Sequence, residues 1–344
     1  MCTRQFFGGV LTLLFLVTFT VAHPMAQVSS GRIVTFDVPG AAYTWPIAIN
    51  DSDVVTGFFS YPASSDTHGF VRNPDGTFTI FDPNGSTTTI AQAINNHGTI
   101  TGFYSNSNGF LRDAAGNITT FTISGARYVE PFSMNDSGEI TGTYQAADFS
   151  WHGFVRDSSG NLTTFDPPNS ASTTPKSISP DGYIVGFFNP LGFSNNEGFV
   201  RDPLGNISLF NVPGAIDRTV AFAVNAFGDI AGEYFGGNTS YHGFMGKVGA
   251  FTKFDAPGAG TAMNQGTVPR CINNSNQVAG YEITKNGNYV SFVRNPSGTF
   301  AVFNAPGAGI NQQLGTVVRG MNNKASTTGY FGDAQNVWHG FLRF

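Results

Sequence analysis

The segment AQAINNHGTITGFYSNSNGFLRDAAGNITTFT, residues 91–122, contains four short apolar runs that are separated by turn-forming residues. The turn Asn95-Asn96-His97-Gly98 places Asn early and Gly late, which is typical of a type I turn closed by a left-handed residue. Alternating apolar and polar residues between such turns predict β-strands. The four expected strands cover residues 91–95, 99–104, 109–113 and 117–122. The segment therefore predicts one four-stranded antiparallel unit.

Three markers show that this unit recurs along the chain. The phenylalanine of a Gly-Phe-(Val/Leu)-Arg motif stands at Phe70, Phe110, Phe154, Phe199, Phe244, Phe292 and Phe341, although the fifth copy lacks the arginine and the sixth lacks the glycine. A Phe-Asp-x-Pro-Gly motif begins, in full or partial form, at Phe36, Phe81, Phe121, Phe165, Phe210, Phe254 and Phe303. An apolar residue and a turn flank Asn50, Asn95, Asn135, Ser179, Asn225, Asn273 and Asn322. Seven units of 40 to 50 residues are typical of a β-propeller.

The order of the markers predicts how the ring is closed. Residues 31–40, GRIVTFDVPG, carry only the fourth strand of a unit, and Phe344 follows directly after a third strand. The N-terminal strand would then complete the last blade, so that the ring has no open edge. We therefore expect an all-β fold over residues 27–344, a seven-bladed β-propeller of four-stranded blades closed by the N-terminal strand.

Residues 1–26 have the layout of a secretory signal peptide. A short basic start precedes an apolar run at residues 6–21, and the small residues Ala22 and Ala26 follow. An uncleaved anchor is the alternative, but the run is short for a bilayer span of roughly 20 residues. We expect a secreted, periplasmic or extracellular protein that has no membrane contact after cleavage. Cleavage also removes Cys2, which leaves Cys271 without a disulfide partner.

The composition argues against some partners. The chain of 344 residues has 17 Lys and Arg against 22 Asp and Glu, and only 11% of its residues are charged, compared with about 25% in an average soluble protein. Such a charge-poor, mildly acidic chain is a poor match for nucleic acid or an anionic membrane. We expect a monomer that binds neither.

The HGF, apolar-Asn-x-x-Gly and FDxPG runs resemble an extracellular repeat family of exported bacterial proteins that is named for its His-Ala-Phe signature. The resemblance covers roughly residues 31–344. Here Gly takes the middle position of the signature, and histidine is present only at His68, His152, His242 and His339. The resemblance implies export and a propeller-like fold. It implies no particular chemistry, because the matching positions are structural.

The repeated histidines and arginines predict structural contacts rather than a site. Neighbouring strands lie ~4.8 Å apart, so histidines in alternate blades are too far apart to share one metal ion. We therefore expect hydrogen bonds within each blade and no metal or other cofactor. The repeated arginine, for example Arg72, is expected to pair with the acidic residue of the FDxPG strand, here Asp82. The alternative is that the arginine row binds a ligand.

Positions that break the repeat predict the binding face. In a propeller the fourth-to-first and second-to-third loops lie on one face, and these loops vary most in length here. Aromatic side chains beside polar groups suit sugar rings. The candidate ligand-contacting residues on this face are Tyr43, Trp45, Glu130, Trp151, Tyr241 and Trp338. Trp45 and Trp338 are expected to share one groove close to Arg319. The alternative for Trp151, Tyr241, Tyr289 and Trp338 is hydrophobic capping of a strand.

Three basic residues occupy equivalent positions on innermost strands. Arg270 and Arg319 stand three residues before the repeat asparagine, and Lys176 takes the matching place in the fourth unit. Innermost strands converge on the ring axis, so these side chains predict a positive mouth for an anion. The alternative is that they form salt bridges or line a hydrated channel.

No linear catalytic motif is present in the sequence. It contains no GxSxG, HExxH, Walker loop or paired-cysteine metal motif, and we assign no catalytic residue. We expect a non-catalytic binding module for carbohydrate or another cell-surface ligand. The alternative is a secreted polysaccharide hydrolase or lyase, in which Glu130, Asp217 and Glu233 supply a carboxylate pair at the central mouth.

Overall fold

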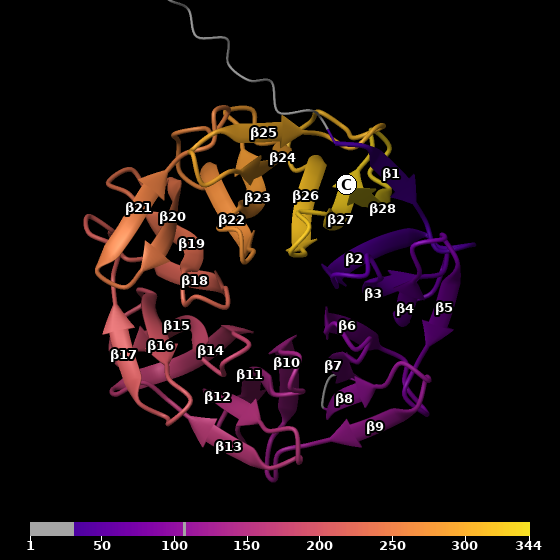
Figure 1. Cartoon of the computed structure of the whole chain (residues 1–344), viewed down its shortest axis with the longest axis horizontal. Helices are drawn as coiled ribbons and strands as arrows, with labels where there is room; N and C mark the ends of the chain where they lie inside the picture. The colour runs from indigo at the N-terminus through magenta and orange to yellow at the C-terminus, as the bar shows by residue number, and fades with distance from the viewer. Residues whose placement is uncertain (1–30, 106–107) are drawn as a thin grey trace, which may run out of the picture.

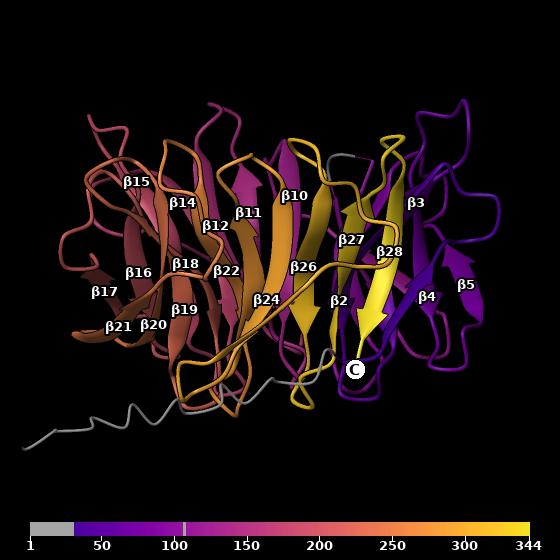
Figure 2. The same cartoon turned by 90° about the horizontal axis from the view of Figure 1, so that it is seen from above.

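The computed structural model describes residues 31–105 and 108–344, so the expected signal peptide at residues 1–26 lies outside the described part. Over these residues the regular secondary structure consists of β-strands, arranged side by side around a central axis (Figure 1). Seen from the side, the strands run roughly along that axis and form a short, wide cylinder (Figure 2). Within the described ranges, no helix has the length and apolar character needed to span a bilayer.

The strands form antiparallel four-stranded units, with the first strand of each nearest the axis. The first unit contains β2 (Tyr43–Ile49), β3 (Val55–Ser60), β4 (His68–Arg72) and β5 (Phe78–Phe81). The next units contain β6 (Thr89–Ile94), β7 (Ile100–Tyr104), β8 (Asn108–Arg112) and β9 (Ile118–Phe121); β10 (Tyr128–Met134), β11 (Ile140–Gln145), β12 (Trp151–Arg156) and β13 (Leu162–Phe165); and β14 (Ser170–Ile178), β15 (Ile184–Pro190), β16 (Glu197–Arg201) and β17 (Ile207–Phe210). They are followed by β18 (Thr219–Val224), β19 (Ile230–Phe235), β20 (Tyr241–Lys247) and β21 (Ala250–Phe254); and by β22 (Gly266–Ile272), β23 (Val278–Ile283), β24 (Tyr289–Arg294) and β25 (Phe300–Phe303).

The two ends of the described chain share one sheet. Strands β26 (Gly315–Met321), β27 (Thr327–Gly332) and β28 (Trp338–Arg343) pair in order, and β1 (Ile33–Phe36) pairs antiparallel with β28. Phe36 stands opposite Gly340 in this pair. The same Phe-to-Gly register joins the outer strands of the first unit, where Phe81 stands opposite Gly69. Strand β1 therefore takes the outer position beside β28.

The repeated phenylalanines explain both sequence motifs. A Cβ atom on Gly69 would lie only 2.7 Å from the ring of Phe81, so glycine is needed beneath this ring. The ring also packs edge to face against Phe110 of the next unit, with centroids 5.9 Å apart. The Gly-Phe and Phe-Asp motifs thus build one contact within a unit and one between units, and their phenylalanines fill the core between neighbouring sheets.

The prediction that the repeated arginines pair with the FDxPG aspartates was wrong. Arg72 stands opposite Phe78, whereas Asp82 follows the other end of β5, and each residue of a strand advances the chain by about 3.3 Å. The Arg72 guanidinium instead lies over the Phe36 ring of the preceding unit, 4.7 Å from its centroid. Equivalent arginine–phenylalanine contacts are made by Arg112, Arg156, Arg201, Arg294 and Arg343.

The FDxPG aspartates form hydrogen bonds with the repeat histidines, as predicted for hydrogen bonding between strands of one unit. The Nδ1 atom of each repeat histidine lies 2.6 to 2.9 Å from an aspartate oxygen of the adjoining strand. The pairs are His68 with Asp82, His152 with Asp166, His242 with Asp255 and His339 with Asp37.

Asparagines link the units at one end of the innermost strands. The Asn50 side-chain amide donates to the Asn95 carbonyl of the next unit at 3.2 Å, and Asn322 donates to the Asn50 carbonyl at 2.9 Å. We call this set the asparagine girdle: Asn50, Asn95, Asn135, Asn225, Asn273 and Asn322. In the fourth unit the position is Ser179, from which no equivalent bond to Asn225 extends.

Candidate functional site

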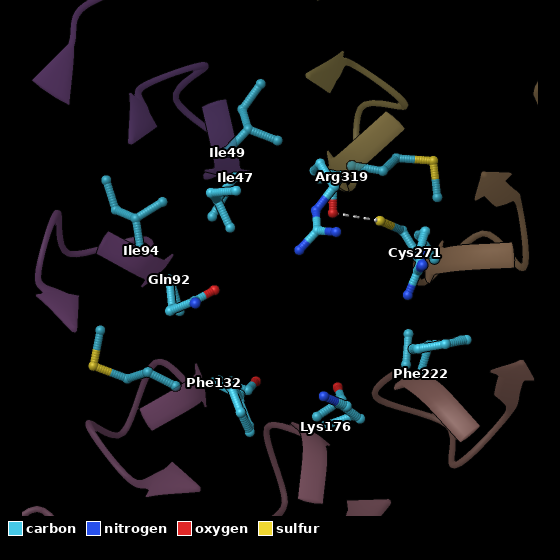
Figure 3. Close-up of a pocket in the computed structure, with 18 of the residues that line it drawn as sticks. Ile47, Ile49, Gln92, Ile94, Phe132, Lys176, Phe222, Cys271 and Arg319 are labelled. Carbon is cyan, nitrogen blue, oxygen red and sulfur yellow. Dashed lines mark hydrogen bonds between the residues drawn. The ribbon is translucent and has the colours of Figure 1, made fainter. Parts of the chain in front are cut away.

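A β-bulge in each innermost strand places one side chain in the central channel. In β2 the pairing with β3 skips from Pro46 to Ala48, so Ile47 is the extra residue. A bulge re-aims its extra side chain, and Figure 3 shows such side chains in the channel, for example Ile47, Lys176 and Arg319. The extra residues, here called the bulge ring, are Ile47, Gln92, Phe132, Lys176, Phe222, Arg270 and Arg319.

The bulge ring lines a cavity of about 350 Å³. Basic residues come from three units, and apolar residues such as Ile47 and Phe132 come from others (Figure 3). Cys271 also lines the cavity, and its thiol donates to the Arg319 carbonyl at 3.3 Å. Burial raises the pKa of this thiol to about 12. The cysteine is therefore protonated at neutral pH and does not act as a nucleophile.

Lys176, Arg270 and Arg319 line the cavity together, and in the described part of the chain none of them forms an ion pair with a carboxylate. Burial and the positive charges of Arg270 and Arg319 lower the pKa of the Lys176 ammonium to about 8. Burial and the Arg270 charge also lower the pKa of Arg319. These directions show that like charges share a poorly hydrated space.

Aromatic rings rather than carboxylates hold two of the basic groups. The Lys176 ammonium lies 4.3 Å from the centroid of the Phe132 ring, and the Arg270 guanidinium lies 4.2 Å from that of Phe222. Arg270 Nη2 also donates to the Tyr281 hydroxyl at 3.1 Å. Such contacts stabilise the cation without neutralising it.

Four aromatic rings gather on strands from the two ends of the described chain. The Trp45 ring stacks on Tyr330 at a centroid distance of 5.0 Å, and it meets Phe58 and Trp338 edge on at 5.3 and 6.1 Å. We call Trp45, Phe58, Tyr330 and Trp338 the aromatic cluster. The indole nitrogen of Trp45 is buried and has no hydrogen-bond partner. The structure thus brings Trp45 and Trp338 together.

The aromatic cluster is connected to the bulge ring through Tyr330. Burial raises the pKa of the Tyr330 phenol, and the nearby Arg319 guanidinium opposes this rise. Tyr330 on β27 stands opposite Val317, two residues before Arg319 on β26. Tyr330 therefore lies next to both the Trp45 indole and the Arg319 guanidinium.

Of the other predicted aromatic site residues, Tyr43 shares β2 with Trp45, whereas Trp151 and Tyr241 lie in different units. Tyr43 is next to Trp45, at a centroid distance of 5.7 Å. Trp151 stacks on Tyr128 at 6.3 Å in the β10–β13 unit, while Tyr241 packs against Phe235 at 4.9 Å in the β18–β21 unit.

Backbone bridges explain the places of Trp151 and Tyr241. Trp151 pairs in parallel with Ser172 of the following unit, and Tyr241 pairs with Gly266 in the same way. A Cβ atom on Gly266 would lie 2.0 Å from the Tyr241 carbonyl oxygen. Both residues therefore have a structural role at a junction between units, in addition to any contact with a ligand.

The carboxylates proposed for catalysis are separated or already paired. Glu233 is 2% exposed, and its Oε1 accepts bonds from Arg218 Nη2 at 2.5 Å and Nε at 2.8 Å. Glu130 lies on β10, and the β14–β17 unit stands between it and Glu233 on β19. Burial raises the pKa of Glu130, and Lys176 opposes this rise. Asp217 is exposed.

One serine, histidine and aspartate stand in line as in a hydrolytic triad. Ser150 Oγ lies 2.7 Å from His152 Nε2, and His152 Nδ1 lies 2.6 Å from Asp166. A nucleophilic serine donates its proton to the imidazole. Ser150 instead donates to the Asp148 carboxylate at 2.5 Å, a group that only accepts. The direction of this bond opposes a nucleophilic role.

The same line recurs in other units with changed residues. A second copy consists of Ser240, His242 and Asp255. In the last unit Asp333 replaces the serine, and its carboxylate lies 3.4 Å from His339 Nε2. Either a hydroxyl or a carboxylate accompanies the histidine Nε2 atom in these units. We therefore interpret the three hydrogen-bonded residues as a structural contact that holds the second-to-third loop in place. No group of three or more histidine, cysteine or acidic side chains in the described ranges is arranged to hold a metal ion.

Tyr281 and Tyr330 were missed in the sequence. The second strand of every unit contains a glycine, and Tyr281 and Tyr330 directly follow Gly280 and Gly329. In the other units the residue after this glycine is Phe58, Phe103, Thr143, Phe187 or Glu233. The variation at this position within an otherwise regular strand was the available signal. At this position Tyr281 accepts a bond from Arg270, and Tyr330 lies next to Arg319.

No family model matches the chain, and no curated protein matches it in sequence. Among solved structures, it is similar to a streptogramin B lyase with a TM-score of 0.58 and 12% identity, over 91% of this chain and 97% of the lyase chain. A puromycin hydrolase gives a TM-score of 0.62 at 11% identity, over 89% of this chain and 53% of the hydrolase. The Dos1 propeller gives 0.50 at 13% identity, over 88% and 78%. These similarities show an all-β, propeller-type fold.

Proposed function

We propose that the protein is an exported, seven-bladed β-propeller that binds carbohydrate at the mouth of its central channel without altering it. In this proposal residues 1–26 are removed, β1 closes the ring as the fourth strand of the last blade, and the protein is a monomer that belongs to the His-Ala-Phe repeat family. The aromatic cluster supplies the surface on which a sugar ring stacks.

Pairing between the chain ends supports the closed ring. Strand β1 pairs with β28, and Asn322 bonds to Asn50 across 272 residues of sequence. The stacking of Trp45 on Tyr330 adds a hydrophobic contact at the same junction. In this proposal β1 completes the last blade, and the asparagine bond and the aromatic stack are two independent contacts between the first blade and the last.

The observation that carries the binding proposal is the aromatic cluster itself. The position of Trp45 is held by Ile90, Glu130, Thr174, Val220, Val268 and Val317 in the other units. Packing of the innermost strand therefore does not demand an indole there. The Trp45 side chain is partly exposed, and aromatic faces suit the C–H faces of sugars.

Binding is favoured over hydrolysis or lysis because the candidate carboxylates are separated or already paired. Glu233 is neutralised by Arg218, and Ser150 donates away from His152. A hydrolytic site needs an acid and a base that converge on one substrate bond.

A glycan-array screen of the chain without residues 1–26 tests this proposal. We expect carbohydrate ligands whose binding decreases several-fold in Trp338→Ala, because each ring contact is typically worth about 1 kcal/mol. Phe227→Ala is the matched control, since Phe227 is 61% exposed in the turn after the girdle residue Asn225. Binding that depends on Phe227 and not on Trp338 would refute the assignment. Release of shortened or unsaturated sugars would establish the hydrolase or lyase alternative instead.

A further inference from the structure

None of the three basic residues of the bulge ring forms an ion pair among the described residues, although the Glu130 carboxylate lies near Lys176. Lys176, Arg270 and Arg319 line one cavity. Burial and the charges of Arg270 and Arg319 disfavour the charged form of Lys176, as its lowered pKa reflects. Buried charges are normally paired or bound to a ligand. A bound anion would relieve this repulsion.

The donors in this cavity are held in place and left open. Phe222 supports the face of the Arg270 guanidinium, and Phe132 supports the Lys176 ammonium. The Nε atom of Arg270 is buried and has no hydrogen-bond partner.

We propose that the carbohydrate is acidic, and that its carboxylate or sulfate group enters the channel and binds Lys176, Arg270 and Arg319 while the sugar ring lies against the aromatic cluster. This inference rests on the proposed function. Arginine suits either group because its fork of N–H donors matches two oxygens of an oxyanion.

The path between the two parts of the site supports one ligand spanning both. Tyr330 stacks on Trp45 and is close enough to Arg319 for the guanidinium to affect the pKa of its phenol. The cavity of about 350 Å³ is at the lower end of the ~300–1,000 Å³ of small-molecule sites. We therefore infer that the channel receives the end of a glycan and not its middle.

Calorimetric titration with four probes tests the inference. The probes are a uronic acid disaccharide, its neutral counterpart with a primary alcohol in place of the carboxylate, its sulfated counterpart, and inorganic sulfate. We expect the carboxylated or the sulfated disaccharide to bind about tenfold or more tightly than the neutral one, since hydrogen bonds to charged groups contribute about 1.5–3 kcal/mol. The tighter of the two identifies the anionic group.

Matched variants separate charge from folding. Arg319→Gln should weaken the acidic probe about tenfold or more and leave the neutral probe unchanged. Lys176→Gln should act in the same direction. Lys176→Gln also keeps the test decisive if Arg319→Gln fails to fold. Arg127→Gln is the control, because Arg127 is exposed in the loop before β10 and lies over the Phe149 ring at 4.1 Å.

The outcomes distinguish this inference from the proposed function. Equal binding of neutral and acidic disaccharides, unaffected by either charge variant, overturns the anion site and keeps carbohydrate binding. Arg319-dependent binding of inorganic sulfate with no sugar binding overturns carbohydrate recognition and keeps the anion site. Failure of all four probes to bind the folded protein overturns both.

Discussion

The two ends of the innermost strands differ in how far they follow the repeat. At the girdle end, six of the seven equivalent positions are asparagine, and each side chain bonds to the next unit. Three residues earlier, the bulge ring contains isoleucine, glutamine, phenylalanine, lysine and arginine. The contacts between units therefore depend on uniform residues at one end, which leaves the side chains at the bulges free to differ.

The largest expected effect comes from removing the strand that joins the chain ends. Deleting residues 31–40 exposes β28 as an open edge and removes Phe36, which covers Gly340. We expect loss of several kcal/mol of folding free energy and a large fall in the thermal midpoint. Differential scanning calorimetry of both forms measures this. An unchanged midpoint would show that β1 is not needed for closure.

Within the girdle, Asn322→Ala should destabilise the fold by about 1–3 kcal/mol, because the buried Asn50 carbonyl and the Asp53 carboxylate each lose a donor. Chemical denaturation gives the free energy of unfolding. Ligand affinity should stay the same, because the girdle is separate from the bulge ring. If Asn322→Ala had normal stability and weakened binding, the girdle would contribute to ligand binding and not to folding.

At the opposite end, Trp45→Ala should weaken carbohydrate binding several-fold, since it removes the central ring of the aromatic cluster. Its loss also removes packing against Tyr330, so its effect on stability must be measured in parallel. Trp338→Ala, at the edge of the cluster, keeps the stack of Trp45 on Tyr330. If both variants bind like the parent protein, the aromatic cluster is only a structural contact.

The basic part of the channel predicts a pH dependence. The charges facing Lys176 are those of Arg270, Arg319 and Glu130, and its pKa of about 8 lies below the ordinary lysine value. An anionic ligand favours the protonated ammonium, so affinity should decrease as pH rises through 8, by less than about tenfold per pH unit. Titrations between pH 7 and 9 measure this change. Lys176→Gln should abolish this pH dependence. If the affinity of the variant still changed with pH, a group other than Lys176 would be the one that titrates.

The same shift affects stability with the opposite sign. Because the unfolded chain binds the Lys176 proton more tightly than the folded one, the free energy of unfolding from this group should rise with pH between 8 and 10.5. Denaturation of the parent protein and of Lys176→Gln across this range isolates the contribution. A decrease in the parent relative to the variant would show that the folded protein stabilises the ammonium.

The smallest expected effect is a repair of the girdle. Ser179→Asn should add the missing donor toward Asn225 and raise the unfolding free energy by about 0.5–1.5 kcal/mol, as for a typical intramolecular hydrogen bond. Comparison of denaturation midpoints checks it. A loss of stability would show that the gap in the fourth unit has a packing reason of its own, for example at the adjacent Pro180.

Much of the fold was predictable because its contacts repeat. Phe81 and Gly69 are read directly from the sequence, and the same pair returns at the chain ends as Phe36 and Gly340. The role of Arg72 was not predictable from composition of the strands alone. Its partner depends on register, which places Asp82 beside His68 and turns the arginine toward the preceding unit.

The site was less predictable than the fold for a related reason. Lys176, Arg270 and Arg319 were identifiable because they break a repeated position. Tyr330 was not, since its importance arises from stacking on Trp45, and that contact exists only after distant segments meet. The bulges were also invisible in the sequence, although they are what turns the seven side chains into the channel.

The pairing of β1 with β28 also bears on the order in which the protein is made and folded. Strand β1 is synthesised before every other described strand, yet its partner β28 is synthesised after all of them. Until then, β1 is an unpaired strand, and loop-closure entropy opposes its docking. We therefore expect refolding to end in a slow step in which the first segment joins the last. Mechanical pulling on the two ends should meet its first resistance at this pair.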